Sequence, residues 1–252
     1  MSKARPPSAG RTLGDVAFES LRADIVRGVL APGSKLRFDS LRRRYQLNVG
    51  ALREGLSRLA AQGLVIGRSQ RGYHVAPLSD TDLADVTALR SAIDSLALRL
   101  ALERGDMEWE KQVISASHEL SRTPRRDPRK PQEPNEQWQE KHRAFHFALL
   151  SGCASPFILQ MHATLFDRAE RYRRAAFKQR LATHDWSSGH EALAHAALNR
   201  SDDAVQLLLQ HISGVARRLG GRSRTPARAP AASQAARARR SPTSPPRRAV
   251  RR

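Results

Sequence analysis

The hydrophobic pattern at the start of the chain is that of an amphipathic helix. Between Leu13 and Arg27 the apolar residues fall on one helical stripe, and Thr12 suits the N-cap position before it. Gly28 can end this helix, and Pro32 with Gly33 predicts a turn after it. The stripe consists of Leu13, Val16, Ala17, Leu21, Ile25 and Val26.

Two further helices are predicted close behind the first one. The segment Phe38–Tyr45 would turn Leu41 and Tyr45 inward, and Gln46 with Leu47 would form the turn that follows. Asn48 suits the N-cap of a third helix at Val49–Gln62. Apolar residues recur in this helix at spacings of four and three, at Leu52, Leu56 and Leu59.

An extended pattern comes next. Gly63 suits the position after a helix C-terminus, and the apolar run Leu64–Ile66 predicts a short strand. Residues 67–72 are basic and rich in turn formers, and Tyr73–Val75 predicts the returning strand. Two helices, a tight turn and a basic hairpin predict a winged helix-turn-helix, which places a helix in a DNA groove.

The rest of the chain predicts helix after helix, with no strand pattern after Val75. The segment Thr123–Pro134 contains four prolines, so we expect a flexible loop there within the helical domain. The predicted helices are Thr81–Arg104, Met107–Arg122, Asn135–Ser151, Ser155–Ala182, Trp186–Asn199 and Asp202–Leu219. Their expected core includes Leu89, Ile93, Leu96, Leu100, Phe145, Leu149, Phe157, Leu159 and Leu165.

These patterns divide the chain into four parts and indicate a mainly α fold. Residues 1–10 are polar and predicted to be disordered, residues 11–78 form the winged helix-turn-helix, and residues 79–220 form an antiparallel helical bundle. Residues 221–252 are a low-complexity basic tail that we expect to be disordered. We call residues 11–78 the DNA reader and residues 79–220 the bundle.

Charge favours a nucleic acid partner. The net charge of the chain is +20, but residues 221–252 hold ten arginines and no acid, and residues 1–10 add Lys3 and Arg5. A charge of +8 therefore remains on the folded part, which still favours an anionic partner. DNA is preferred over a membrane surface because no large apolar moment accompanies the basic stretches.

Composition also indicates the compartment. Cys153 is the only cysteine, which excludes an internal disulfide and suits a reducing cytosol. The start of the chain lacks the apolar region of a secretory signal, and no apolar run is long enough to cross a membrane. We therefore expect a cytoplasmic protein.

Polar residues lie where such a DNA reader would meet DNA. The start of the third helix offers groups that can reach bases or phosphates, while the helix before it and the hairpin turn supply further phosphate contacts. A solvated charged face is the alternative interpretation. The candidate residues are Arg37, Arg43, Asn48, Gly50, Arg53, Ser57, Arg68, Arg71 and Gly72.

The sequence of this region resembles the DNA-binding signature of the GntR family, in its FadR/FCD subfamily. The residues that carry the resemblance are Leu52–Leu56, Leu59, Gln62–Val65 and Arg71–Leu78. Many relatives have an arginine where this chain has Val49, so the operator is expected to differ from the common one. Residues 49–56 resemble the branch that includes the carbon-starvation-induced repressor.

Histidines offer a second candidate site. His142 and His146 are four residues apart, which puts both imidazoles on one helical face, where they can bind one metal ion. His190 and His211 lie on two later helices and could join them inside the bundle. Isolated histidines are more often surface or satisfied core residues.

The resemblance extends to residues 81–219 and strengthens the metal interpretation. It implies an antiparallel bundle with a metal held by an Asp-x-x-x-His pair and two later histidines, which match His146, His190 and His211. The aspartate position is His142 here, which favours Zn²⁺ or Ni²⁺ over harder ions. The stretch between His190 and His211 is one residue shorter than usual.

An effector site is implied beside this metal. Arg90 matches the family arginine that faces the cavity, and a guanidinium there would hold a small carboxylate, a dicarboxylate among the candidates. Asp94 lies one turn further, so an Arg90–Asp94 surface pair is the alternative. Arg171 and Arg173 are further candidates for the cavity.

The leading hypothesis is a homodimeric transcription regulator, a repressor that binds a palindromic operator in double-stranded DNA and is released by a small carboxylate. Two other classes remain as alternatives. A metal-dependent enzyme could use the histidine cluster, although no general base is evident beside it. A nonspecific architectural DNA-binding protein would need only the charge and the tail.

Overall fold

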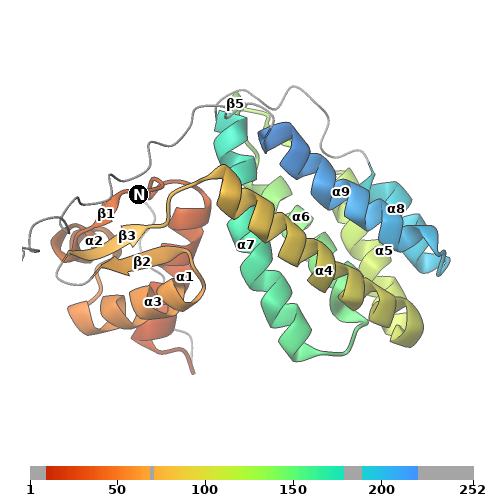
Figure 1. Cartoon of the computed structure of the whole chain (residues 1–252), viewed down its shortest axis with the longest axis horizontal. Helices are drawn as coiled ribbons and strands as arrows, with labels where there is room; N and C mark the ends of the chain where they lie inside the picture. Colours follow the sequence, from red (N-terminus) through yellow and green to blue (C-terminus); the bar gives the residue numbers. More distant parts are fainter. Residues whose placement is uncertain (1–9, 69–70, 179–188, 221–252) are drawn as a thin grey trace, which may run out of the picture. The chain divides into compact units, whose positions relative to one another are not determined.

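The computed structural model describes residues 10–68, 71–178 and 189–220 (Figure 1). The fold is mainly helical, with a winged helix-turn-helix followed by an all-helical bundle, as the sequence predicts. Residues 1–9 and the tail 221–252, both predicted to be disordered, lie outside the described residues. The same holds for residues 179–188, where one helix was predicted to end and the next to begin.

The DNA reader consists of three helices and a small sheet, drawn red to orange in Figure 1. Helix α1 begins after a capping box in which Thr12 and Asp15 exchange hydrogen bonds. Strand β3 pairs with both other strands in the antiparallel order β1-β3-β2. The elements are α1 (Leu13–Val26), β1 (Lys35–Leu36), α2 (Phe38–Tyr45), α3 (Val49–Ala61), β2 (Val65–Arg68) and β3 (Gly72–Val75).

A compact apolar core fixes α3 in the reader. Leu52, Leu56 and Leu59 are fully buried, so their face of α3 is anchored as the spacing predicts. Gly55 allows α3 to approach α1 closely, because a Cβ there would lie 2.8 Å from the backbone nitrogen of Phe18. The opposite face of α3 is consequently left open to solvent.

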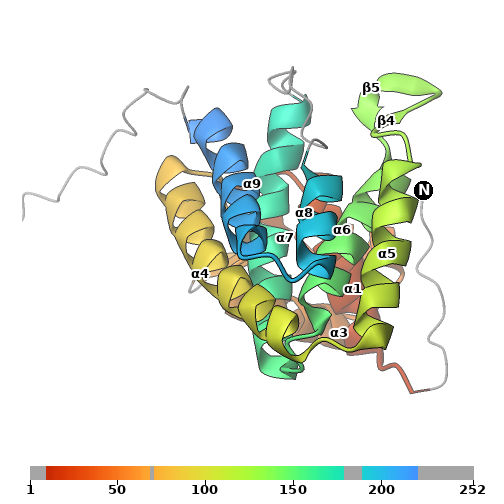
Figure 2. The same cartoon turned by 90° about the vertical axis from the view of Figure 1, so that its right-hand side faces the viewer.

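The bundle contains six helices among the described residues, yellow to blue in Figures 1 and 2. Ser79 caps the first of them by accepting a hydrogen bond from the Asp82 backbone at 3.1 Å. They are α4 (Asp80–Arg104), α5 (Met107–Ser121), α6 (Glu136–Ser151), α7 (Pro156–Lys178), α8 (His190–Leu198) and α9 (Asp203–Gly220). Among the described residues, none of these helices has the length and apolar character needed to cross a bilayer.

The prediction of a flexible loop at Thr123–Pro134 is wrong in one respect. It contains a β-hairpin of β4 (Arg126–Asp127) and β5 (Lys130–Pro134), which stands beside α5 and α6 in Figure 2. Its two-stranded ladder has no neighbour, so the prolines of β5 remove no bond that a third strand would need. Strands this short and this rich in proline leave no alternating pattern in the sequence.

The predicted bundle core is only partly correct. Phe145, Leu149 and Leu165 are buried, and Ile93, Leu100 and Leu159 are half-buried. Three other residues expected in the core are exposed: Leu89 by 54%, Leu96 by 43% and Phe157 by 70%. Helical spacing alone does not distinguish a core stripe from a second apolar stripe on the same helix.

Candidate DNA-reading face and metal centre

All nine predicted DNA-contact residues are exposed in the structure. Asn48 has a structural task as well, because its side-chain oxygen accepts a hydrogen bond from the Ala51 backbone at 2.8 Å and caps α3. Its amide nitrogen remains available to a base or a phosphate. Arg53 lies one turn into α3, and its guanidinium is 5.9 Å from the centre of the Phe38 ring. The start of α3 therefore presents polar groups on an anchored helix.

Ion pairing separates two groups of arginines in the reader. Arg44 pairs with Asp24 at 2.9 Å, and Arg58 pairs with Asp15 at 2.7 Å. The hydrogen bond from Arg58, with those from Thr12, lowers the pKa of Asp15 to about 2. These pairs hold the helices together.

Five other arginines of the reader carry charge that no acid compensates among the described residues. Within the described ranges no ion pair engages Arg37, Arg43, Arg53, Arg68 or Arg71, all of which were predicted as DNA contacts. A solvated face that serves only solubility needs no such separation into paired and unpaired arginines. The unpaired set is therefore the better candidate for phosphate and base contacts.

The wing is formed by β2 and β3. Arg68 faces Gly72 at the end of the ladder, and residues 69–70 lie outside the described range. Gly72 has a φ of +76°, a left-handed conformation that glycine adopts without a steric penalty. Arg68 and Arg71 thus stand on either side of the wing tip.

Four histidines meet inside the bundle. His142 and His146 come from α6, His190 begins α8, and His211 lies on α9. Their ligand atoms all lie within 4.8 Å of one another, and all but the half-buried His211 are buried. The structure thus brings together the four residues predicted as metal ligands.

The contact between His142 and His146 fits a shared cation. Their Nε2 atoms are 3.2 Å apart. Two nitrogens bound to one tetrahedral zinc at about 2.0–2.1 Å would be about 3.3 Å apart. Both rings also have a buried Nδ1 without a hydrogen-bond partner among the described residues. An imidazole that binds a metal through Nε2 keeps its proton on Nδ1, so the close Nε2 contact is the observation that suits a metal ion.

Electrostatics keep these two imidazoles neutral. Burial lowers the pKa of His142 well below 6.5, and the nearby His146 and Arg173 lower it further. Burial likewise lowers the pKa of His146, with contributions from His211 and Arg90. Neutral imidazole is the form that binds metal ions.

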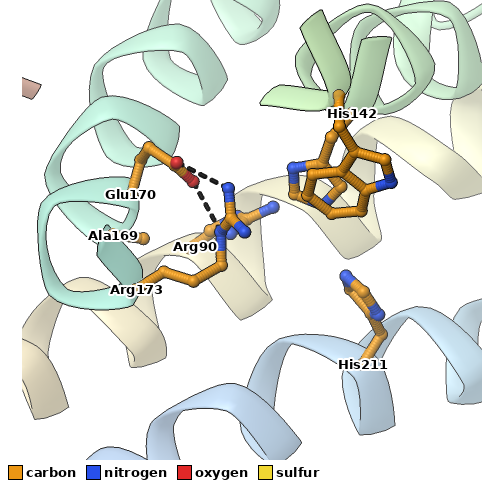
Figure 3. A pocket seen from close by; sticks show the side chains of 7 residues that line it. Arg90, His142, Ala169, Glu170, Arg173 and His211 are labelled. Atoms are coloured by element: carbon orange, nitrogen blue, oxygen red, sulfur yellow. Dashed lines mark hydrogen bonds and ion pairs between the residues drawn. The ribbon is translucent and has the colours of Figure 1, made fainter. Parts of the chain in front are cut away.

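A small pocket adjoins the cluster (Figure 3). Arg90 from α4 and Arg173 from α7 point toward it from one side, and His142 and His211 lie on the other. Its volume is about 20 Å³, which is room for only one or two waters. The lining residues are Arg90, Trp138, His142, Ala169, Glu170, Arg173 and His211.

Arg90 and Asp94 form a buried pair that belongs to this site. The Arg90 Nε donates to Asp94 at 3.0 Å, and the two side chains are 10% and 0% exposed. The interpretation as a surface pair is therefore wrong. The Nη2 atom of Arg90 is buried and has no hydrogen-bond partner among the described residues, so a donor is left for a ligand.

Arg171 and Arg173 differ in position. Arg171 does not line the pocket, because its guanidinium donates to the backbone carbonyl of Ala76 at the end of the reader. Arg173 lines the pocket and is held by Glu170 at 2.7 Å and by the side-chain oxygen of Gln139. Of these two candidates, the structure thus favours Arg173 over Arg171 as the second cationic group at the pocket.

Several residues of the site carried no sequence prediction. His162 is fully buried, and its Nδ1 lies 2.7 Å from Asp94, which places it behind Arg90. Trp138 stacks on His142 with ring centres 4.7 Å apart. Trp138 precedes His142 by one helical turn, and this spacing is the signal by which it could have been predicted. No motif or spacing in the sequence marks His162 or Glu170 as a site residue.

Two family models match the chain. The model of bacterial regulatory proteins of the gntR family matches residues 13–75, and the FCD domain model matches residues 85–214. These ranges fall within the DNA reader and the bundle as the sequence predicts them.

Relatives agree with these matches. The chain is 40% identical over 203 residues to an uncharacterized HTH-type transcriptional regulator, BphR, of Paraburkholderia xenovorans, covering 80% of this chain and 83% of that protein. It is 38% identical over 200 residues to the HTH-type transcriptional repressor GlaR of Escherichia coli, covering 77% of this chain and 90% of the repressor.

Solved structures share the fold. Escherichia coli McbR/YncC has a TM-score of 0.67 at 16% identity, covering 81% of this chain and 95% of that one. A GntR regulator from Rhodococcus has a TM-score of 0.65 at 18% identity, covering 84% and 99%.

Proposed function

This chain belongs to the GntR family of bacterial regulatory proteins and carries an FCD domain, and from that premise we propose that it is a homodimeric repressor released by a small carboxylate. Transcription regulation itself follows from the family and from relatives that are regulators and repressors, not enzymes. The proposal adds the effector, the metal and the dimer. It also places the protein in the cytoplasm, where its DNA target lies.

The operator is proposed to be palindromic double-stranded DNA, read by two copies of α3. Arg53 is the main base contact, and Asn48, Gly50 and Ser57 border it on the exposed side of α3. Arg37, Arg43, Arg68 and Arg71 bind phosphates or the minor groove. Their lack of acidic partners among the described residues supports this role. Val49 at the start of α3 offers no hydrogen bond to a base.

The metal site is proposed to consist of His142, His146, His190 and His211. The donor set contains only neutral imidazoles, which suits Zn²⁺ or Ni²⁺. A bound divalent ion would supply a positive charge and a Lewis-acid position for a carboxylate oxygen. Four neutral ligands leave that charge uncompensated, whereas a carboxylate in place of His142 would neutralise half of it.

The effector is proposed to bind between this cluster and Arg90. The observation that carries the proposal is the unpartnered, buried Nη2 of Arg90 at the wall of a pocket lined by His142 and His211. Asp94, itself held by His162, fixes the orientation of the guanidinium. The pocket is too small for an acid as it stands, so Arg173 must leave Glu170 or Gln139 when the effector enters.

Helix α7 is proposed to carry the signal to the DNA reader. Glu170 and Arg173 line the pocket, and one turn earlier Asp167 accepts hydrogen bonds from Arg22 of α1 at 2.8 Å and from Arg143 of α6. A shift of α7 on effector binding would therefore change a contact with the reader. The effector then lowers DNA affinity because it favours the shifted state.

Thermal-shift measurements on the full chain test the effector site. Small dicarboxylates and 2-hydroxy acids are added with and without a chelator. We expect at least one acid to raise the melting temperature in proportion to the logarithm of its concentration, and the chelator to abolish the effect. If no acid shifts the wild-type protein, the proposed effector class is wrong.

A further inference from the structure

The outer face of α4 is apolar and uncovered within the chain. Leu89 is 54% exposed and Leu96 is 43% exposed, although both are large hydrophobic residues. Ala88, beside Leu89, and Ala92, between the two leucines, share this helical face and are exposed as well. Leu89, Ala92 and Leu96 form a stripe along the helix, which we call the α4 stripe.

This stripe is additional to the face by which α4 joins the bundle. Val86, Ala97, Leu98 and Ala101 are fully buried against the other helices. A helix that is apolar on all sides is normally covered on all sides. On α5, exposed Met107 and Ile114 are also seven residues apart, but Glu110 and Lys111 lie between them and break the stripe.

Charges at the two ends of the stripe are opposite and symmetrically placed. Asp85 lies seven residues before Ala92, and Arg99 lies seven residues after it. Both are exposed, and neither has an ion-pair partner in the part of the chain that the structure describes. Seven residues are about two helical turns, so Asp85, Ala92 and Arg99 share one face.

Such a face is complementary to itself under two-fold symmetry. In an antiparallel pair of helices centred on Ala92, Asp85 of each copy meets the partner's Arg99. The same arrangement puts the exposed Leu96 over the partner's Ala88, so a large side chain meets a small one. A two-fold interface requires this kind of self-complementarity.

We propose that α4 is the central dimer contact, packed antiparallel on α4 of a second copy with the two-fold axis at Ala92. The inference rests on the proposed function, since that requires a dimer, and adds the surface and its register. The hydrophobic centre stabilises the dimer through burial of apolar area. The paired charges at both ends select this register over shifted ones.

The register has a consequence for the operator. Helix α4 follows the DNA reader directly, and its first residue, Asp80, is twelve residues from Ala92. At 1.5 Å per residue, Asp80 lies about 18 Å from the axis, so the two copies of Asp80 lie about 36 Å apart. Half-sites one DNA turn apart are separated by about 34–36 Å. The α4 pair thus spaces the attachment points of the two readers to match adjacent major grooves.

A charge-swap series on the full chain tests this surface. The dimer dissociation constant is measured by sedimentation for wild type, Asp85→Arg, Arg99→Asp and the double variant. Each single change places like charges together twice per dimer, so we expect about tenfold weaker association. In the double variant the charges are opposite again, so association returns to within about threefold of wild type.

Matched variants test the apolar centre. Leu96→Asp is expected to give monomers, whereas Ile114→Asp, a change at the 55% exposed Ile114 on α5, leaves the dimer intact. Circular dichroism checks that each variant is folded. The surface is wrong if the single charge changes leave the dimer unaffected, and the register is wrong if they weaken it but the double variant does not recover.

Different outcomes test the α4 surface and the repressor function. If the charge variants remain dimeric, bind a palindromic operator and respond to an acid, the α4 surface is wrong and the repressor proposal stands. If the swap restores dimers that bind no palindromic DNA, the surface stands and the repressor proposal falls. A wild-type chain that stays monomeric at micromolar concentration contradicts both.

Discussion

Arg90 donates through Nε to the carboxylate of Asp94 at 3.0 Å, inside the bundle and not on its surface. Asp94 also contacts His162 at 2.7 Å, so the carboxylate is held from two sides. This leaves the Nη2 atom of Arg90 buried and unpartnered among the described residues. A buried charged donor with no acceptor is costly, and a ligand oxygen would remove that cost.

Replacing Arg90 with Gln is expected to weaken the response to the effector. Hydrogen bonds to charged groups contribute about 1.5–3 kcal/mol, so affinity for the acid falls by about 10- to 100-fold. The measurement is the acid-dependent rise in melting temperature, with Arg122→Gln, an exposed change after α5, as the matched control. An unchanged response in Arg90→Gln would show that the acid binds elsewhere.

Metal content distinguishes the histidine cluster from ordinary core histidines. His146→Gln removes a central ligand and is expected to lose Zn²⁺ or Ni²⁺, measured by elemental analysis after gel filtration. His142→Asp retains a ligand atom and is expected to bind metal with a preference moved toward harder ions. His118→Gln, an exposed change on α5, serves as the control. Equal metal content in His146→Gln and His118→Gln contradicts the assignment.

The metal-free protein is expected to lose stability below pH 6.5. Burial lowers the pKa of His142 and His146 in the folded state, so below the unfolded-state pKa of 6.5 the unfolded chain binds protons that the folded chain does not. The free energy of unfolding then falls as pH falls, by up to about 1.4 kcal/mol per pH unit for each histidine. Urea unfolding with a chelator at pH 7.5, 6.5 and 5.5 measures this slope.

A variant checks the origin of that slope. His142→Asn combined with His146→Asn removes both imidazoles, so its stability should depend less on pH in the same range. The same steep dependence in this variant would show that the titrating groups are not His142 and His146.

The DNA reader could be predicted closely from the sequence, because its signals are local. The spacing of Leu52, Leu56 and Leu59 and the cap at Asn48 predict α3 to within one residue at its end. Strand β1 was not predicted, since its two residues become a strand only by pairing with Tyr73 and His74 of β3. Such a pairing joins distant parts of the chain and leaves no periodic pattern.

The bundle site was harder to predict, because its residues come from separate helices. The i, i+4 pair His142 and His146 indicated a site by itself, whereas His162 offered no pattern. The exposure of Leu89 and Leu96 could not be predicted, because periodicity shows that a face is apolar but not what covers it. The difference between prediction and structure at these two residues is the basis of the proposed dimer surface.

Asp167 is expected to couple the effector site to the DNA reader. Asp167→Asn removes the charge shared by Arg22 and Arg143. Affinities for DNA alone and for the acid alone should change by less than about threefold. The coupling free energy, by which the acid weakens DNA binding, is about 1–3 kcal/mol in such regulators and should become smaller. DNA binding with and without saturating acid measures the coupling.

Asp24→Asn is the matched control for this variant. Asp24 also pairs with an arginine, Arg44, but the pair lies wholly within the reader. The route through α7 is contradicted if both variants keep full coupling, or if Asp24→Asn loses as much of it as Asp167→Asn.

Operator binding with and without the effector tests the central claim most directly. Sequences selected from a random duplex library by the full chain are expected to contain two inverted half-sites about one helical turn apart. Fluorescence anisotropy on the selected duplex should then show that the acid identified by thermal shift weakens binding by about 10- to 100-fold, and that Arg53→Ala weakens it without acid. Selected sequences without inverted half-sites, or an affinity that the acid leaves unchanged, would contradict the account.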